Sequence, residues 1–426
     1  MNAATSLLPS ERELAASAAR VMARCDELRQ VSGSDEYYAR TYLSPEHKAA
    51  NQRVGGWMAE AGLESWEDAV GNIWGRYPAK DPAAKTFVIG SHLDTVIDAG
   101  TYDGVLGVLL GLELASYLKR REISLPFHLD VVGFGDEEGV RFGATLLGSR
   151  ALAGKWEEDL LDLTDAGGVS LAQAMTDFGL DPGRYPEAAR PSDVMEGYLE
   201  VHIEQGPVLE DNNLPLGVVT SIAGARRFSF LIEGAAGHAG TVPMVLRRDA
   251  LVGASQCISS IEKVCALFDV VATVGSIQSF PGAVNVIPGQ VQFSLDIRSA
   301  QDRSRDLAFD RLIAQFQKIV DEKNLFLSWQ EIHTADSVPC DSRLQRRLEQ
   351  ALTDAGQEVK SLFSGAGHDA MAMKDFAPLA MLFVRCAAGI SHHPDEAIEV
   401  EDVRAALDVL GRFALAELPQ VEESVA

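Results

Sequence analysis

The amino-acid sequence predicts an α/β protein in which a mostly parallel sheet, flanked by helices, is interrupted by a smaller α+β domain. Apolar strand segments alternate with helical segments in the first half of the chain and again near its end, which is typical of a parallel sheet covered by helices. Between these regions, four strands and two helices follow a different order. Since 426 residues suffice for two cores, we predict one domain from residues 1–222 and 336–426 and a second from residues 223–335.

The larger domain has clear helix and strand signals. Apolar residues at helical spacing predict a helix over residues 11–31. A second helix is expected to begin at Pro45, with Ser44 as its N-cap. Further elements alternate along the chain: strands over residues 69–77 and 86–89, a helix over 103–119, a strand over 127–134, a helix over 146–155, a strand over 198–206, a helix over 342–355, a strand over 379–385 and a helix over 403–418.

The smaller domain contains a different arrangement. Strands are predicted over residues 226–233, 270–279, 290–298 and 325–332, and helices over 246–267 and 304–322. This β-α-β-β-α-β order is that of a ferredoxin-like fold.

The composition favours a soluble, cytoplasmic protein. A net charge of −25 argues against a nucleic acid or an anionic membrane as partner. The five cysteines are scattered and form no C-x-x-C motif, as expected for free thiols in a reducing compartment. The N-terminus lacks the pattern of a signal peptide, and the longest apolar stretch, Val105 to Leu112, is too short to span a membrane.

Histidines and carboxylates follow several of the predicted strands, which favours a metal site. His92 and Asp103 lie at a strand exit and a helix entrance, and Glu138, His202 and His392 lie at other strand ends or loop tips. Two divalent ions about 3.5–4 Å apart need one bridging carboxylate and terminal ligands on each side. Asp103 suits the bridge. His92 and His202 would then hold one ion, and Glu138 and His392 the other.

Two further carboxylates have predicted roles beside these ligands. Glu137 adjoins Glu138, and side chains of adjacent residues diverge on an extended chain, so Glu137 is free to act as general base and then general acid. Asp94, two residues after His92, is a candidate for holding an imidazole in one tautomer. The alternatives are a solvated acidic turn at Glu137 and a structural histidine with a helix cap at His92 and Asp103.

Eight motifs between Gly90 and Glu396 resemble one family, the allantoate amidohydrolase / N-carbamoyl-L-amino-acid hydrolase / β-ureidopropionase group of hydantoinase/carbamoylase amidases. This group belongs to the dinuclear-metal superfamily of aminoacylases and carboxypeptidases. The motifs are Ser91-His-Leu-Asp-Thr, Asp136-Glu-Glu-Gly-Val-Arg-Phe, His202-Ile-Glu-Gln-Gly-Pro, Gly237-His-Ala-Gly-Thr-Val-Pro-Met, Asn285-Val-Ile-Pro-Gly, Asp296-Ile-Arg-Ser, Ser364-Gly-Ala-Gly-His-Asp and Ile390-Ser-His-His-Pro.

The resemblance implies a metal-bearing α/β domain and an inserted lid that also makes a homodimer. Carried over to this sequence, the metal ligands are His92, Asp103, Glu138, His202 and His392, and the base is Glu137. The family's Ser-His-x-Pro motif has two histidines here. We assign His392 because it directly follows the serine, and His393 is the alternative.

The resemblance also implies substrate-binding residues. Arg298 and Asn285 would bind the substrate's carboxylate, for which an arginine fork is well suited. His238, from the other subunit's lid, would reach the developing oxyanion, and Gln205 would touch the ureido group. The loop at Gly365 and Ala366 offers backbone N–H groups to an anion. Alternatives are a surface ion pair for Arg298 and a turn role for His238.

The predicted reaction is hydrolysis of a ureido C–N bond in a small acid, with release of ammonia and carbon dioxide. Allantoate, a compound of purine catabolism that would yield ureidoglycine or ureidoglycolate, is the first choice, since Arg226-Arg227 resembles the allantoate-acting members. An N-carbamoyl-L-amino acid is the alternative, and an N-acyl amino acid or dipeptide a more distant one. The ligands suit two ions of manganese or zinc, with cobalt or nickel also possible.

Overall fold

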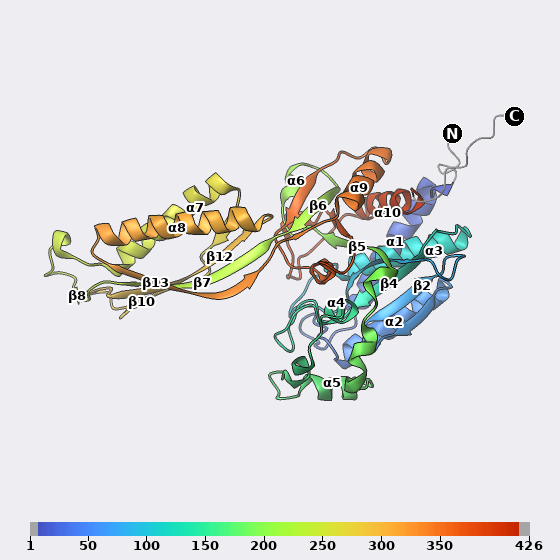
Figure 1. Ribbon diagram of the computed structural model, residues 1–426, viewed down its shortest axis with the longest axis horizontal. Helices are drawn as coiled ribbons and strands as arrows, with labels where there is room; N and C mark the ends of the chain where they lie inside the picture. Colours follow the sequence, from blue (N-terminus) through green and yellow to red (C-terminus); the bar gives the residue numbers. More distant parts are fainter. Residues whose placement is uncertain (1–6, 417–426) are drawn as a thin grey trace. The chain divides into compact units, whose positions relative to one another are not determined.

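The computed structural model describes residues 7–416, which form two units (Figure 1). The first consists of residues 7–220, 340–362 and 368–416, and the second of residues 221–339 and 363–367. Residues 363–367, which we predicted in the first domain, pack in the second. Residues 417 and 418 of the predicted last helix lie outside the described residues.

The first unit contains the mixed sheet, and its central strands are parallel. The strands lie in the order β1 (Glu64–Glu67), β2 (Ile73–Tyr77), β4 (His128–Phe134), β3 (Thr86–His92), β5 (Met195–Ile203), β16 (Leu379–Val384) and β6 (Leu216–Ile222), and β15 (Ser361–Ser364) also pairs with β6. β4, β3, β5 and β16 are mutually parallel, whereas β1, β2 and β6 pair antiparallel at the two sides. The prediction of an α/β protein with a mostly parallel central sheet is confirmed.

Helix α3 (Val105–Arg120) directs Asp103 toward the strand ends. It packs against β3, β4 and β5 on one side and against α1 and α10 on the other, so almost all of its length is buried. A helix covered on both sides needs no polar face, which explains its continuous apolar sequence. At Gly107 an added Cβ would collide with the Val201 carbonyl oxygen, so this glycine allows the helix to lie close to β5.

The other helices of the first unit surround the sheet. They are α1 (Glu11–Arg29), α2 (Pro45–Glu60), α4 (Leu147–Leu152), α5 (Leu171–Phe178), α6 (Val208–Asp211), α9 (Ser342–Asp354) and α10 (Val400–Leu415), with short 3₁₀ turns η2 (Glu158–Asp162), η3 (Pro182–Ala188), η4 (Ser192–Val194), η6 (Asp369–Met373) and η7 (Ala387–Gly389). Ser44 caps α2 as predicted, since its side chain accepts a hydrogen bond from the His47 N–H.

The second unit is an antiparallel sheet with two helices on one face (Figure 1). Its strands lie in the order β10 (Ile277–Phe280), β12 (Gln290–Ser299), β7 (Gly224–Glu233) and β13 (Phe326–Ala335), and β9 (Val271–Thr273) also pairs with β12. The helices are α7 (Ala250–Phe268) and α8 (Asp302–Glu322), with a 3₁₀ turn η5 (Met244–Leu246). Two short ladders complete the unit, β8 (Gly237–His238) with β11 (Val286–Ile287), and β14 (Val338–Pro339) with the end of β6.

Two predicted elements of this unit differ from the structure. The strand predicted over residues 270–279 is divided into β9 and β10, because the N–H groups of Gly275 and Ser276 donate to the Ser294 hydroxyl instead of continuing the ladder. Helix α7 begins four residues later than predicted, since Asp249 caps its N-terminus by accepting from Leu251 and Val252.

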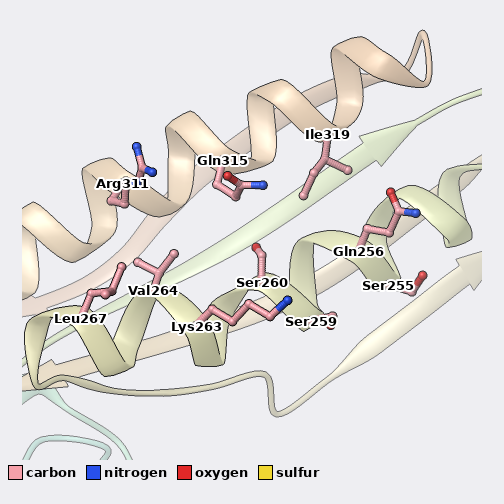
Figure 2. A pocket seen from close by; sticks show the side chains of 10 residues that line it. All are labelled: Ser255, Gln256, Ser259, Ser260, Lys263, Val264, Leu267, Arg311, Gln315 and Ile319. Atoms are coloured by element: carbon pink, nitrogen blue, oxygen red, sulfur yellow. The ribbon is translucent and has the colours of Figure 1, made fainter.

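Helix α7 is, by length and composition alone, long and apolar enough to cross a membrane. Its buried residues pack in the core of the second unit, against the sheet and α8. Figure 2 shows the groove between α7 and α8, which is lined mainly by polar side chains, including Lys263 and Arg311.

Candidate metal centre

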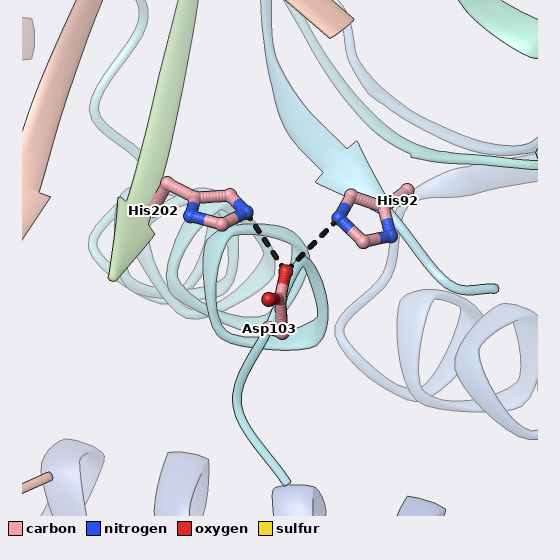
Figure 3. A group of neighbouring side chains, drawn as sticks. All are labelled: His92, Asp103 and His202. Carbon is pink, nitrogen blue, oxygen red and sulfur yellow. Dashed lines mark ion pairs between the residues drawn. The ribbon is translucent and has the colours of Figure 1, made fainter. Parts of the chain in front are cut away.

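Three side chains from separate parts of the first unit converge on one carboxylate oxygen. His92 ends β3, His202 lies near the end of β5, and Asp103 comes two residues before α3. Because β3 and β5 are parallel, their ends meet at the same edge of the sheet. The Nε2 atoms of His92 and His202 lie 3.3 and 3.1 Å from Asp103 Oδ1 (Figure 3). All three side chains are buried.

The second oxygen of Asp103 faces the remaining predicted ligands. His392 Nε2 lies 3.3 Å from Asp103 Oδ2 and 3.4 Å from Glu138 Oε1. Ser391 Oγ and Gln205 Nε2 also donate hydrogen bonds to Asp103 Oδ2, at 2.6 and 2.8 Å. Gln205, which we predicted to touch substrate, therefore lies against the candidate bridge. Asp103 stands between two groups of donors, which is the position of a bridging carboxylate.

The structure distinguishes the two adjacent histidines. His392 belongs to the cluster around Asp103 and Glu138. The His393 side chain is 58% exposed, and its Nδ1 accepts a hydrogen bond from the Asp395 N–H at 3.2 Å. Only His392 of the two offers a nitrogen to the cluster.

Asp94 supports the cluster through the backbone. Its carboxylate accepts hydrogen bonds from the N–H groups of Glu137 and Glu138, at 3.1 and 3.2 Å. His92 Nδ1 lies 2.9 Å from the Asp94 carbonyl oxygen but 3.6 Å from its carboxylate. The carbonyl is the nearer acceptor for Nδ1, and Nε2 is left to face Asp103. The Ile203 carbonyl is likewise the acceptor for His202, at 2.9 Å from Nδ1.

Three non-glycine residues near the cluster have left-handed backbone conformations. The φ angles are 61° at Asp136, 56° at Gln205 and 55° at His392. Such conformations cost free energy and persist where the surrounding structure holds them. Here Asp136 and Gln205 lie within three residues of a candidate ligand and His392 is itself one, so part of the chain's backbone strain lies where the side chains converge.

The pKa values of the candidate ligands are shifted because several carboxyl groups are buried close together. Burial raises the pKa of Glu137 well above its usual range, opposed by His92 and reinforced by Glu138. Burial likewise raises the pKa of Glu138 to about 7. Burial would also raise the pKa of Asp103, but the three histidines around it outweigh this effect and hold the pKa well below its usual range. The pKa of His92 is raised, because Asp103 and Asp94 outweigh its burial.

This donor set fits divalent cations. Three groups of ligand atoms lie within 4.8 Å of one another: His92, Asp103 and His202; Asp103, Glu138 and His392; and His92, Glu137 and Glu138. Within residues 7–416, no lysine or arginine pairs with Asp103, Glu137 or Glu138. Buried carboxylates require a partner of opposite charge, and imidazole with carboxylate suits manganese, zinc, cobalt or nickel.

Several buried polar side chains lie beside the cluster but were not among the residues that the sequence predicted for the site. Glu200, on the same face of β5 as His202, accepts hydrogen bonds from Ser91 Oγ at 2.7 Å and the Ala370 N–H at 2.8 Å. Alternation along a strand places residues two apart on one face, so Glu200 could have been found from its spacing to His202. His368 is also buried, with its ring centroid 4.5 Å from that of His202.

Glu396 is a further missed residue, and it connects two ligand-bearing loops. Its Oε1 accepts hydrogen bonds from the N–H groups of Tyr102 at 2.6 Å and Asp103 at 3.1 Å. An added Cβ at Gly100 would collide with the same carboxylate. The loop that carries His392 is thereby tied to the loop that carries Asp103. No local sequence pattern signals this contact.

In the second unit, the Arg298 guanidinium donates hydrogen bonds to other residues of the same unit. Its Nε and Nη2 atoms donate to the two oxygens of Asp296, each at 2.9 Å, and its Nη1 donates to the Gly365 carbonyl at 2.7 Å. The Ala366 N–H, which we predicted to be open to an anion, donates to Ser364 Oγ at 3.2 Å. The helical segment that follows is only the five-residue turn η6, so the predicted helix N-terminus is a weak one.

His238 and Asn285 lie together at the short β8–β11 ladder, which is a separate two-stranded sheet. His238 pairs with Val286 in the β8–β11 ladder, and the Ala239 N–H donates to the Asn285 carbonyl at 2.9 Å. His238 Nδ1 accepts from the Gly240 N–H at 3.1 Å, so its proton is on Nε2, which is free to donate. This ladder adjoins Gln290, eight residues before Arg298 on β12, a separation of about 27 Å along a strand. Within a single copy of the second unit, His238 and Asn285 therefore lie far from Arg298.

Comparison with known proteins gives a consistent set of relatives. The model of peptidase family M20/M25/M40 matches residues 88–416. The chain is 41% identical over 422 residues to an allantoate deiminase of Arabidopsis thaliana, covering 90% of this chain and 79% of that one. It is 40% identical over 372 residues to an N-carbamoyl-L-amino acid amidohydrolase of Geobacillus stearothermophilus, covering 87% and 91%. A solved hydantoinase/carbamoylase family amidase from Burkholderia ambifaria superposes with a TM-score of 0.88 at 30% identity, covering 95% and 98%.

Proposed function

The chain belongs to peptidase family M20/M25/M40, and on that premise we propose that this hydrolase cleaves the ureido C–N bond of a small acid with the help of two divalent cations. The observation that carries the proposal is the convergence of imidazole and carboxylate atoms on both oxygens of Asp103. The relatives named allantoate deiminase and N-carbamoyl-L-amino acid amidohydrolase, each about 40% identical to this chain, support the reaction class. Five buried free cysteines agree with the proposed cytoplasmic location.

We assign one cation to His92, Asp103 and His202, and the other to Asp103, Glu138 and His392. Manganese or zinc would suit these ligands, and so would cobalt or nickel. When bound, such cations polarise a carbonyl group and lower the pKa of a water molecule toward about 7. Asp94 and the Ile203 carbonyl hold the ligands in the required orientation.

Glu137 is the proposed proton carrier. Its carboxylate takes a proton from the water that attacks the ureido carbonyl carbon, and then returns a proton to the substrate nitrogen as the C–N bond breaks. The carbamate that leaves decomposes to ammonia and carbon dioxide. His238 would donate from Nε2 to the carbonyl oxygen as it gains charge.

Recognition of the substrate's carboxylate is assigned to the second unit, which we propose to be a ferredoxin-like lid. Arg298 and the Gly365–Ala366 loop would bind the carboxylate beside Asp296. A small ureido acid is far shorter than the distance of about 27 Å that separates Arg298 from the Asn285 and His238 end. We therefore propose that His238 and Asn285 reach the site from the lid of a second copy in a homodimer, and that each site is incomplete in a monomer.

Allantoate is the proposed substrate, and an N-carbamoyl-L-amino acid is the second candidate because relatives with both activities are about 40% identical to the chain. The test is ammonia release from allantoate, a panel of N-carbamoyl-L-amino acids and N-acetyl amino acids, with manganese, zinc, cobalt and nickel supplied in turn. Turnover of ureido acids but not N-acetyl amino acids is expected. Turnover of N-acetyl amino acids alone would contradict the proposal.

A further inference from the structure

A buried arginine outside the metal centre contacts the loop that follows His92. Arg40 lies in the segment between α1 and α2, and its side chain is completely buried. Its Nε atom donates a hydrogen bond to the Leu93 carbonyl at 2.6 Å. The Leu93 N–H donates to the Phe134 carbonyl of β4 at 2.9 Å, so both backbone polar groups of Leu93 are held. Leu93 stands between His92, a candidate ligand, and Asp94, whose carboxylate supports the same cluster.

The backbone of Arg40 contacts the same loop. The Arg40 N–H donates to Thr95 Oγ1 at 2.8 Å, and the Thr95 N–H donates to the Arg40 carbonyl at 2.9 Å. Nearby, the Ala99 N–H donates to the Tyr38 carbonyl at 3.0 Å. Residues 93–104 contain no helix or strand. Individual contacts of this kind, and not a periodic ladder, therefore fix the path of this loop.

The Arg40 guanidinium is a buried cation that forms no ion pair with a carboxylate of residues 7–416. Its Nη1 atom donates to the carbonyls of Leu28 at 2.9 Å and Val31 at 3.4 Å. Leu28 lies in the last turn of α1, and Val31 lies just beyond the end of this helix. Because the C-terminal end of a helix carries partial negative charge, α1 offsets part of the cost of burying the cation. A neutral side chain would avoid this cost, so the arginine is explained by the carbonyl groups that it holds.

We propose that Arg40 is a positioning residue of the metal centre, which holds the Leu93 peptide group so that His92 and Asp94 face their partners. The proposal rests on the function proposed above, in which His92 and Glu138 bind different cations. If the peptide between Leu93 and Asp94 turned, the Asp94 carbonyl would leave His92 Nδ1, and the Asp94 carboxylate would leave the Glu138 N–H. Arg40 therefore acts on both cation sites, although it donates no hydrogen bond to a ligand in the described chain.

Metal affinity distinguishes this role from a contribution to stability alone. A ligand that has to be reoriented when the ion binds lowers the affinity, and the loss of an outer-shell contact costs about 10–100-fold. If Arg40 only stabilised the fold, its substitution would lower the melting temperature and leave the metal affinity of the folded protein unchanged. The affinity of the folded variants is therefore the deciding measurement.

The test titrates metal-free, full-length protein with Co²⁺ and measures the visible absorption of the bound ion and its affinity in competition with a chelator. R40M removes every donor of the guanidinium, so its Co²⁺ affinity should fall about 10–100-fold, with a changed absorption spectrum. R40K keeps the charge and one donor group for the Leu93 carbonyl, so it should recover part of the loss. R305M is the matched control. It removes a buried guanidinium of the second unit, which pairs with Asp302 at 2.8 Å, and should keep the parent's affinity.

Thermal unfolding shows which variants are folded. If R40M does not fold, R40K and T95V carry the test. T95V removes the side-chain acceptor of the Arg40 N–H, and each of these two variants should lose about tenfold in Co²⁺ affinity. Affinities equal to the parent's in the folded variants, or an equal loss in R305M, overturn the role of Arg40 and leave the proposed function intact. So does an equal loss in R40K and R40M. A parent that binds no Co²⁺ ends both the proposed metal centre and this role.

Discussion

The first unit gathers negative charge at its centre, whereas the second gathers positive charge on its sheet. Around Asp103, Glu137 and Glu138 no lysine or arginine among the described residues balances the carboxylates. On the sheet of the second unit, one carboxylate, Asp296, is shared by Arg227 and Arg298. These two charge distributions are the basis of the proposals above, cations held by the first unit and the substrate's carboxylate bound by the second. Changes in the first unit should therefore alter metal content and kcat, and changes in the second should alter KM.

The largest expected effect comes from removing the shared carboxylate of the first unit. In D103N, both groups of ligands lose their common charge, so we expect loss of both cations and a fall in activity beyond the roughly 10–100-fold that an outer-shell change costs. Metal analysis and ammonia release measure this. D98N makes the same chemical change at an exposed position in the same loop and should be unaffected. Two ions retained in D103N would remove Asp103 from the bridge.

A substitution of Glu137 tests catalysis separately from metal binding in the first unit. If it carries the proton and is not a ligand, E137Q should lower kcat by about 10²–10⁴-fold while both cations remain bound. E138Q, at the adjacent ligand, should lose metal. The same metal content in both variants, or unchanged turnover in E137Q, would show that the two glutamates are assigned wrongly. This result matters because Glu137 also lies near His92 and Glu138 in a third group of ligand atoms.

In the second unit, the expected effect is on substrate binding. R298A removes the guanidinium proposed to pair with the carboxylate, so KM should rise by about 10–100-fold, as for loss of a charged hydrogen bond, with metal content unchanged and kcat changed less. A ureido amide should be a poor substrate for the parent. Equal rates on acid and amide, or a loss confined to kcat, would place the carboxylate elsewhere.

A smaller effect is expected from a glycine in the first unit. Gly104 and Gly143 both have positive φ, 67° and 74°. A Cβ at Gly104 would lie 2.5 Å from His92 Nε2, but a Cβ at Gly143 would meet nothing within 4 Å. Both alanine variants carry similar backbone strain, and only G104A displaces a ligand. We expect metal affinity to fall about tenfold in G104A and to be kept in G143A. Equal affinities would show that His92 can move without consequence.

The smallest expected effect is on stability in the absence of metal. Burial raises the pKa of Glu138 from 4.5 to about 7, and it raises the pKa of Glu137 well above its usual range. Between these values the folded state binds more protons than the unfolded state, so stability falls as pH rises. The melting temperature of metal-free protein should drop by a few degrees from about pH 5 to about pH 7.5. Bound cations should suppress this drop, and an equal drop in metal-loaded protein would contradict it.

The strand ends were the most informative part of the sequence. His92 and His202 come at the ends of predicted strands, and parallel strands of an α/β sheet end at one edge, so their meeting near Asp103 could be anticipated. Glu200 could have been found by the same reasoning, from its spacing to His202. Glu396 could not, because its contact with the Asp103 N–H spans 293 residues and depends on two loops that no periodic pattern describes.

The second unit was less predictable, because its candidate substrate-binding residues lie at or near the surface and Arg298 pairs with a neighbouring carboxylate. Arg298 was predicted to offer its fork to a ligand, but the alternation of β12 places Asp296 on the same face, two residues away, where it takes two of the donors. The interruption between β9 and β10 depends on the Ser294 hydroxyl. Hydrogen bonds between polar side chains, or from a side chain to the backbone, cannot be predicted from the pattern of apolar residues.

The sequence by itself determined the family, the alternation of strands and helices, and the set of imidazole and carboxylate donors, because apolar periodicity and motif order are properties of the chain alone. Only the tertiary structure decided that His392 and not His393 joins the cluster, that Asp103 turns one oxygen toward each group of donors, and that Asp296 accepts from two donors of Arg298. The reason is that charges and hydrogen bonds act through space over a few ångströms. Which groups lie that close is decided by folding, and not by their order along the chain.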